Sequence, residues 1–124
     1  QLQQVCLNLL MNAIHAMPSG GTLRIAVERV VRRKGELDLA APAEYVVLEI
    51  SDSGPGIPED HRDKIFEPFF TTKPIGRGTG QGLAIARAIL ERHGGSISFT
   101  SEIGVGTTFV VQLPCAEIPA ERAA

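Results

Sequence analysis

Two glycine-rich segments of this 124-residue chain carry residue types that could bind a nucleotide. The first covers residues 52–58 and begins with Asp52; the second covers residues 76–83, where every second residue up to Gly82 is a glycine. A carboxylate can accept a hydrogen bond from an exocyclic amine, and the free N–H groups that start a helix can bind phosphates. Together the two segments predict a nucleotide pocket with a mobile cover.

Strand parity assigns a role to Asp52. Leu48 and Ile50 share one face of a predicted strand, and Asp52 continues that face at the strand end, where a carboxylate is costly unless it is hydrogen-bonded. Thr107 continues the apolar face of the last strand in the same way. We therefore expect Asp52 to accept from the amine of adenine, and Thr107 to assist through its hydroxyl or a water. Taken alone, Asp52 would be a turn residue before Gly54, and Thr107 an ordinary strand threonine.

A polar stripe on the first predicted helix supplies candidate metal ligands. Gln4, Asn8, Asn12 and His15 are spaced by four, four and three residues, which places them on one helix face. Amide oxygens suit Mg²⁺, which takes its other ligands from water and phosphates. We assign Asn12 as a direct ligand and Asn8 as a direct or water-mediated one. Gln4 is better explained as a solvated residue, and His15 fits a phosphate or lid contact and a plain surface position equally.

The second glycine-rich segment predicts the phosphate contacts. Gly78, Gly80 and Gly82 permit close backbone approach, and Lys73 and Arg77 add positive charge suited to the β- and γ-phosphates. The segment is not a P-loop, because no Gly-Lys-Ser/Thr follows at the required spacing. Its glycine spacing alone would also describe a flexible linker, but the aspartate and the paired asparagines favour a phosphate site.

Phe66, Phe69 and Phe70 form an aromatic cluster inside the long loop between the two halves of the chain. Such a cluster either pins the loop to the body of the domain or forms a patch that docks again when a nucleotide or partner arrives. We favour the anchoring role as the primary one.

The elements that position these residues follow from hydrophobic periodicity and from glycine and proline breaks. Helices are predicted over residues 2–17, 59–65 and 80–93, and strands over residues 22–30, 44–52, 96–101 and 107–113. The remaining stretches are a surface connection at 31–43, a long loop at 53–80 and a frayed tail at 114–124. This pattern predicts an α+β fold, a two-layer α/β sandwich whose sheet is covered on one face by helices. Leu23, Ile25 and Val27 would belong to the covered face.

Composition restricts the class of protein. The chain is 44% hydrophobic and 21% charged with a net charge of −2, which is typical of one globular domain and argues against a general nucleic-acid surface. Cys6 and Cys115 are expected to be free thiols in a reducing cytoplasm, with Cys6 a packing residue of its helix. No apolar run is long enough to cross a bilayer. Because there is no initiator methionine and Gln1 begins inside a predicted helix, we expect a fragment of a longer protein.

Taken together, these segments resemble the catalytic, ATP-binding domain of sensor histidine kinases, in the GHKL ATPase superfamily shared with gyrase, mismatch-repair and heat-shock chaperone proteins. Residues 8–16 are similar to the asparagine box of that family, and residues 66–70 to its phenylalanine box. Residues 52–56 resemble its first glycine box and residues 76–83 its second. Residues 104–109 resemble the last motif of the family. The likeness covers residues 1 to about 114. The run 69–73 is most similar to kinases of the nitrogen-regulation type.

The resemblance implies a mixed, mostly antiparallel sheet backed by helices, with Mg²⁺ and ATP held between helix and lid. It implies an ATP-binding domain over residues 1–113, with the lid at 53–80. It further implies transfer of the γ-phosphoryl group to a histidine on a separate dimerisation domain that this chain lacks, with a response regulator downstream. The domain itself would contact neither nucleic acid nor membrane.

The resemblance also implies a set of site residues. Those expected to bind ATP are Asn8, Asn12, His15, Asp52, Gly54, Gly56, Ile57, Lys73, Arg77, Gly78, Thr79, Gly80, Gly82, Leu83 and Thr107. Catalytic roles fall to Asn8, Asn12 and Lys73, and metal ligation to Asn12 and Asn8.

One position departs from the family pattern, because Gln81 stands where the family usually has leucine. A polar residue there leaves open a nucleotide sensor or scaffold without phosphotransfer. An anti-sigma-factor-type serine kinase of the same superfamily is the other alternative, although the complete phenylalanine box argues against it.

Overall fold

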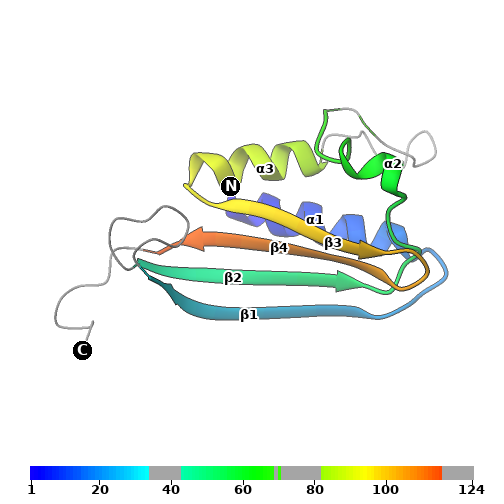
Figure 1. The fold of residues 1–124 in the computed structure, drawn as a ribbon, viewed down its shortest axis with the longest axis horizontal. Helices are drawn as coiled ribbons and strands as arrows, with labels where there is room; N and C mark the ends of the chain where they lie inside the picture. Colours follow the sequence, from blue (N-terminus) through cyan, green and yellow to red (C-terminus); the bar gives the residue numbers. More distant parts are fainter. Residues whose placement is uncertain (34–42, 69, 71–81, 116–124) are drawn as a thin grey trace.

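The computed structural model describes residues 1–33, 43–68, 70 and 82–115, which form a layer of helices over a sheet (Figure 1). In chain order the elements are α1 (Leu2–Ala16), β1 (Leu23–Arg32), β2 (Ala43–Asp52), α2 (Glu59–Arg62), α3 (Gly82–Arg92), β3 (Ser96–Glu102) and β4 (Gly106–Pro114). The predicted α+β, two-layer architecture is confirmed. Among these residues, no helix has the length and apolar character that crossing a bilayer requires.

The four strands form one sheet in the order β1-β2-β4-β3. Each of the pairings between these described strands is antiparallel, so the parallel pair that a mixed sheet would contain is not found among them. The register places Asp52 opposite Leu23 on one side and Thr107 on the other, and it places Thr107 opposite Ser101. These four residues therefore form one row across the sheet.

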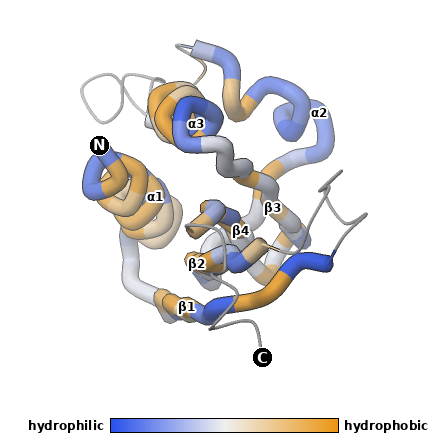
Figure 2. Tube along the Cα trace, turned by 90° about the vertical axis from the view of Figure 1, so that its left-hand side faces the viewer, coloured by the Kyte–Doolittle hydropathy of each residue, from blue (hydrophilic) through white to orange (hydrophobic). Residues whose placement is uncertain are grey.

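The two longer helices form because their apolar residues recur at helical spacing, and each buries one stripe. The buried stripe of α1 is Val5, Leu9 and Ala13, and that of α3 is Ala86, Ile89 and Leu90. Both stripes belong to one core with residues of β2 and β4, chiefly Ile50, Phe109 and Val111. The helices lie side by side on the same face of the sheet (Figure 2).

The apolar face of β1 was expected to lie under the helices, and this expectation is wrong. Leu23, Ile25 and Val27 are 37%, 52% and 64% exposed, although Ile25 stands directly opposite buried Ile50. The cause is the reach of the helix layer, since the main contacts with the sheet are those of α1 with β2 and of α3 with β3. The three residues do lie on the same face of the sheet as Ile50, as their alternation predicts, but the helices do not reach this outer strand.

Cys6 is also exposed, contrary to the expected packing role. The buried stripe of α1 repeats every four residues from Val5, which leaves its neighbour Cys6 outside the stripe. Cys6 and Cys115 are both free thiols, as predicted.

Candidate functional site

The residues predicted to hold a nucleotide come from segments that meet at one end of the molecule. Figure 1 shows the end of β2, the start of β4, the end of β3, the last turn of α1 and the start of α3 gathered at this end, next to α2. Asp52 and Thr107 are the buried polar residues of the described chain, with 9% and 6% of their surface exposed. The predicted pairing of these two side chains at the mouth of the apolar face is confirmed by their register.

Asp52 uses one carboxylate oxygen for the fold and leaves the other available. Its Oδ1 accepts the Gly54 N–H at 2.9 Å, as a turn-initiating aspartate does. Oδ2 has no hydrogen-bond partner among the described residues, and it is not among the fully enclosed polar atoms. The two readings of Asp52 are therefore compatible: one oxygen shapes the turn, and the other can accept a donor from a ligand.

Thr107 belongs to a small hydroxyl network that the sequence reasoning missed. Its Oγ1 lies 2.8 Å from Oγ of Ser101, which in turn accepts the Ile57 N–H at 2.8 Å. Ser101 could have been found by the parity argument used for Asp52, because it continues the face of Ile97 and Phe99 at the end of β3.

Arg62 ties the start of the predicted lid to the β3–β4 hairpin, which contains Ser101. Its Nε donates to the Ile57 carbonyl at 3.1 Å, and its Nη2 donates to the Ser101 carbonyl at 2.9 Å. Ile57 itself packs against the core. The first residues of the predicted lid are therefore held to the sheet end by the side chains of Arg62 and Ser101.

Gly54 and Gly56 are required by the protein's own packing. A Cβ on Gly54 would lie 2.9 Å from the Ala16 carbonyl oxygen at the end of α1. Gly56 has a φ of +84°, and a Cβ there would lie 2.6 Å from the Glu102 carbonyl oxygen. The first glycine box thus lets the chain pass between α1 and the β3–β4 hairpin, which places Asp52 and Ile57 at the site.

The polar stripe of α1 faces the start of α3. Asn8 Nδ2 donates to the Gly82 carbonyl at 3.0 Å, and Asn8 Oδ1 accepts from Gln4 Nε2 at 2.7 Å. Asn12 is half-buried, and its amide makes no hydrogen bond with other described residues. His15 lies half-buried in the last turn of α1, toward the same end of the molecule.

These contacts separate the two predicted metal ligands. The Asn12 amide is available to a ligand, whereas Asn8 already links α1 to α3, and its Oδ1 has one lone pair left beside the Gln4 contact. No group of three or more His, Cys, Asp or Glu side chains suited to a metal occurs among the described residues. A metal held here would depend on amide oxygens together with oxygens brought by the nucleotide, and such a donor set fits Mg²⁺.

Within the described part of the chain, the start of α3 is not crowded where the phosphates are expected. A Cβ on Gly82 would meet only Asn8 atoms of that part, at 3.8 Å, so its packing does not require glycine there. Leu83 packs against the core behind it. The predicted contacts of Lys73, Arg77, Gly78, Thr79 and Gly80 lie outside the described residues, as do Gln81 and the tail from residue 116.

The phenylalanine cluster anchors the base of the predicted lid, residues 57–68, as expected. The centroid of the Phe66 ring lies 6.0 Å from the ring centroid of Phe99 and 6.4 Å from that of Phe109. The Arg87 guanidinium carbon lies 5.5 Å from the Phe66 ring centroid. Phe70 packs edge-on against His61 at 5.4 Å. Phe69 lies outside the described residues.

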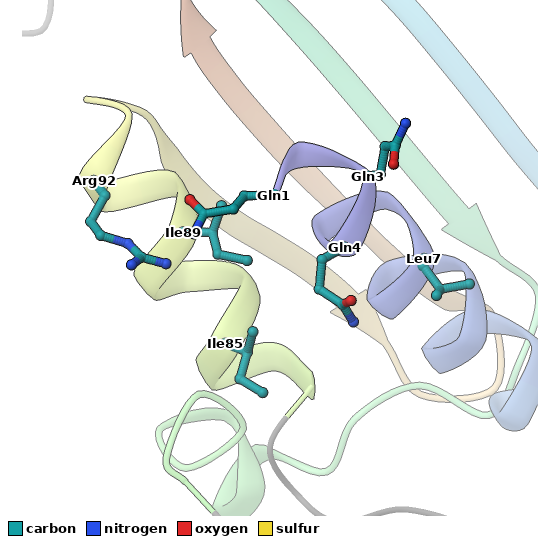
Figure 3. A pocket seen from close by; sticks show the side chains of 7 residues that line it. All are labelled: Gln1, Gln3, Gln4, Leu7, Ile85, Ile89 and Arg92. Atoms are coloured by element: carbon teal, nitrogen blue, oxygen red, sulfur yellow. The ribbon is translucent and has the colours of Figure 1, made fainter.

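A separate cavity of about 540 Å³ lies between the first turns of α1 and one side of α3 (Figure 3). It is lined by Gln1, Gln3, Gln4, Leu7, Ile85, Ile89 and Arg92. None of these residues belongs to the predicted nucleotide site. The cavity and the Asp52 end of the sheet are therefore distinct.

Comparison with known proteins agrees with this geometry. Residues 1–117 match the family described as histidine kinase-, DNA gyrase B- and HSP90-like ATPase. The chain therefore belongs to this ATPase family.

Within the family, its relatives are sensor kinases. The chain is 46% identical over 118 residues to the sensor kinase CckA of Brucella abortus, which covers 92% of this chain and 12% of CckA. It is 40% identical over 114 residues to the sensor histidine kinase ZraS of Salmonella typhimurium, covering 92% of this chain and 22% of ZraS. The chain thus spans less than a quarter of either relative, and it corresponds to the ATP-binding catalytic domain of sensor histidine kinases.

Solved structures support the same assignment. The nucleotide-free catalytic domain of the histidine kinase ThkA matches with a TM-score of 0.70 and 38% identity, over 91% of this chain and 65% of that one. Full-length ShkA in complex with AMPPNP matches with a TM-score of 0.72 and 29% identity, over 96% of this chain and 22% of that one. The finer likeness to nitrogen-regulation kinases stays a prediction.

Proposed function

We propose that this domain binds Mg²⁺ and ATP at the Asp52 end of the sheet and donates the γ-phosphoryl group to a histidine on a separate dimerisation domain of its parent protein. The observation that supports this most directly is the convergence of an available Asp52 carboxylate oxygen, an available Asn12 amide and the open start of α3. These groups come from segments 30 or more residues apart in the sequence, and they suit the base, the metal and the phosphates of one ligand.

The purine would lie against the apolar mouth of the sheet. Asp52 Oδ2 accepts from the exocyclic amine of adenine, and the Thr107 hydroxyl contacts the neighbouring ring edge directly or through a water. Ile57 and the anchored lid base close one side of this subsite.

The phosphates would extend toward α1 and α3. Backbone N–H groups at the start of α3 point at an anion and carry the positive end of the helix dipole. Asn12 ligates Mg²⁺ directly, and Asn8 does so directly or through water. When bound, Mg²⁺ would neutralise charge on the phosphate oxygens and orient them. Lys73 and Arg77 would add positive charge from the lid.

The absence of a base at Asn8 suits phosphoryl transfer to imidazole. Asn8 carries an amide, and an amide cannot take a proton from water. The imidazole nitrogen needs no such help, because its lone pair forms the new P–N bond while the bond to the leaving oxygen breaks and ADP departs with the electron pair. We therefore propose that the site favours transfer over hydrolysis.

The partners follow from this chemistry. We propose that the acceptor is the parent's own histidine-bearing domain, that a response regulator receives the phosphoryl group from it, and that the domain works in the cytoplasm. Free Cys6 and Cys115 fit a reducing compartment. The relatives are sensor kinases, so a serine kinase of the anti-sigma-factor type and a sensor without transfer are less well supported.

The test combines binding and transfer. Calorimetry should detect binding of a non-hydrolysable ATP analogue that strengthens with Mg²⁺, and labelled γ-phosphate should appear on the parent's histidine-bearing domain only when this chain and Mg²⁺ are both present. The chain alone should stay unlabelled. Absence of nucleotide binding would contradict the proposal at its base, and binding without transfer would favour the sensor alternative.

A further inference from the structure

The sulfur of Met17 lies where three segments of the chain meet. Met17 directly follows α1, and its Sδ lies 3.4 Å from the Ser53 backbone nitrogen and 3.5 Å from Ser53 Oγ. Ser53 follows Asp52 at the end of β2, and its Oγ accepts the N–H of Thr22, the residue before β1, at 2.8 Å. Figure 1 shows the end of α1, the start of β1 and the end of β2 at the same end of the molecule. The thioether therefore links the end of the first helix to the end of the second strand.

The atoms around this sulfur are closely packed. The thioether accepts the N–H and the Oγ–H of Ser53, and both contacts are of the weak kind that a thioether makes. A Cβ on Gly21 would lie 2.5 Å from Met17 Sδ, so the sulfur occupies space that only a glycine leaves free. Met17 is nevertheless only half-buried, and its neighbours Gly21 and Ser53 are exposed, so a small solute can reach the sulfur.

A thioether within reach of solvent can be oxidised to a sulfoxide. Hydrogen peroxide transfers one oxygen atom: a lone pair of the sulfur forms the S–O bond, the O–O bond breaks, and the second oxygen leaves as water. The sulfur loses two electrons, and the peroxide gains them. At Met17 the lone pairs that would take the oxygen are those that accept from Ser53.

The added oxygen has no room in the present arrangement. The sulfur lies 3.4 Å from the Ser53 nitrogen, whereas a hydrogen bond from that nitrogen to a sulfoxide oxygen would alone take about 2.9 Å. Beside Gly21 there is no space even for a Cβ. Either Met17 or the turn at Ser53 must therefore move when the sulfur is oxidised.

We propose that Met17 is a modification site, at which oxidation of the thioether to the sulfoxide by hydrogen peroxide loosens the junction between the end of α1 and the turn after β2. Methionine sulfoxide reductases reverse this reaction, so the site is a redox switch of the junction. Asn12 and His15 belong to the later turns of α1, and Asp52 ends β2, so oxidation also lowers the affinity for ATP. This last consequence rests on the proposed function.

The chain contains two methionines, which provide matched variants. Met11 is 41% exposed within α1. In Met11→Leu only Met17 can form a sulfoxide, and in Met17→Leu only Met11 can. Both variants also carry Cys6→Ser and Cys115→Ser, so that oxidation of thiols does not contribute. Peptide mass spectrometry after treatment with hydrogen peroxide identifies the methionine that carries the added oxygen.

Oxidation of the Met11→Leu chain should lower its thermal midpoint by about 3 °C or more, and hydrogen exchange of the Ser53 and Gly54 amides should become about tenfold faster. Its affinity for a non-hydrolysable ATP analogue with Mg²⁺ should fall by about fivefold or more. Methionine sulfoxide reductases, one for each sulfoxide epimer, should restore all three values. The oxidised Met17→Leu chain should change its midpoint by less than about 1 °C and keep its affinity.

Three outcomes would overturn the inference. These are a fully oxidised Met17 with unchanged midpoint and exchange, equal effects of oxidation in the two variants, and a Met17 that resists peroxide under conditions that convert Met11. Failure of both variants to bind the nucleotide before treatment would instead contradict the proposed function, and the midpoint and exchange would still test the junction.

Discussion

Asp52 illustrates how one side chain can serve the fold and a ligand through different atoms. Its Oδ1 holds the Gly54 N–H, so the turn after β2 depends on an oxygen that asparagine also possesses. Only Oδ2 is left for the base, and in asparagine that atom would become an NH₂ donor facing the donor amine of adenine.

Asp52→Asn should therefore weaken ATP binding by at least about tenfold, while the thermal midpoint changes by only a few degrees. Titration calorimetry and thermal unfolding would measure the two effects. Asp63→Asn, at an exposed position after α2, serves as the control and should change neither. An unchanged affinity in Asp52→Asn would remove Asp52 from the site.

Asn12→Ala should abolish the effect of Mg²⁺ on nucleotide affinity, because the available amide is the proposed direct ligand. The measurement is the dissociation constant for ATP with Mg²⁺ and with EDTA. The two values should differ by about tenfold or more in the unmodified chain and should coincide in the variant. Gln3→Ala, an exposed position on the same helix, should retain the full difference. A variant that still responds fully to Mg²⁺ would show that another group ligates the metal.

At this scale, the sequence predicted the residues whose position follows from parity. Asp52 and Thr107 are buried and paired because they continue apolar faces, and Gln4 is exposed as expected. The contact of Asn8 with the Gly82 carbonyl was not predictable, because it depends on how closely α1 and α3 approach. The place of Ser101 beside Thr107 could have been predicted from the sequence, because Ser101 continues the face of Ile97 and Phe99.

The elements divide the glycines of the site into two kinds. Gly56 has a left-handed backbone, and the hairpin carbonyl of Glu102 leaves no room for a side chain. Gly82 begins α3 with ordinary space around it. The first kind is required by folding. At Gly82 none of the described residues requires glycine, and a bound phosphate would.

Alanine substitution should separate the two kinds. Gly56→Ala should lower the free energy of unfolding by about 2 kcal/mol or more, through backbone strain and the steric conflict with Glu102. Gly82→Ala should leave it unchanged or raise it by less than about 1 kcal/mol, yet weaken ATP binding by crowding the phosphates. Urea unfolding and calorimetry measure both quantities. Normal ATP affinity in Gly82→Ala would show that the phosphates do not approach the start of α3.

The phenylalanine cluster gives the lid base its own stability. Phe66→Ala removes a ring that packs against Phe99, Phe109 and the Arg87 guanidinium, and it should lower the free energy of unfolding by about 2 kcal/mol. Hydrogen exchange should also become faster in residues 57–68, because their anchor is lost. Phe66→Leu, which keeps apolar volume, should recover much of the loss. Unaltered exchange in Phe66→Ala would mean that the other contacts of this segment, such as those of Arg62 and Ser101, fasten it without the Phe66 ring.

Element boundaries were predictable where glycine and proline mark them, as at the ends of α1 and β2. They were less so where tertiary contacts decide. β1 continues to Arg32 because its last residues pair with the first residues of β2. The helix predicted over residues 59–65 is shorter in the structure, where α2 ends at Arg62 and tertiary contacts of Arg62 and Phe66 hold the segment.

The molecule as a whole places its helix layer off-centre on the sheet. α1 and α3 cover β2, β4 and β3. β1 is an outer strand of the described sheet, and its residues Leu23, Ile25 and Val27 are exposed. A sequence pattern gives the face on which a side chain lies, but the width of the covering layer depends on how many helices the whole molecule supplies. The burial of β1 was therefore beyond prediction from its alternation.

A pair of substitutions tests this asymmetric cover. Ile25 and Ile50 face each other on the same side of neighbouring strands, yet they are 52% and 2% exposed. Replacing each in turn by threonine keeps the β-branched shape, so the two variants differ mainly in the burial of the site. Ile50→Thr should lower the free energy of unfolding by about 2 kcal/mol or more, because it puts a hydroxyl into the core. Ile25→Thr should change it by less than about 1 kcal/mol and should reduce aggregation in concentrated solution, because it shrinks an exposed apolar row on an outer strand.

Equal losses of stability in the two variants would mean that β1 is covered in solution, by another copy or by a further part of the protein. Light scattering across a concentration series would then identify the cover: mass that rises with concentration indicates a second copy, and a constant monomer mass indicates the chain itself.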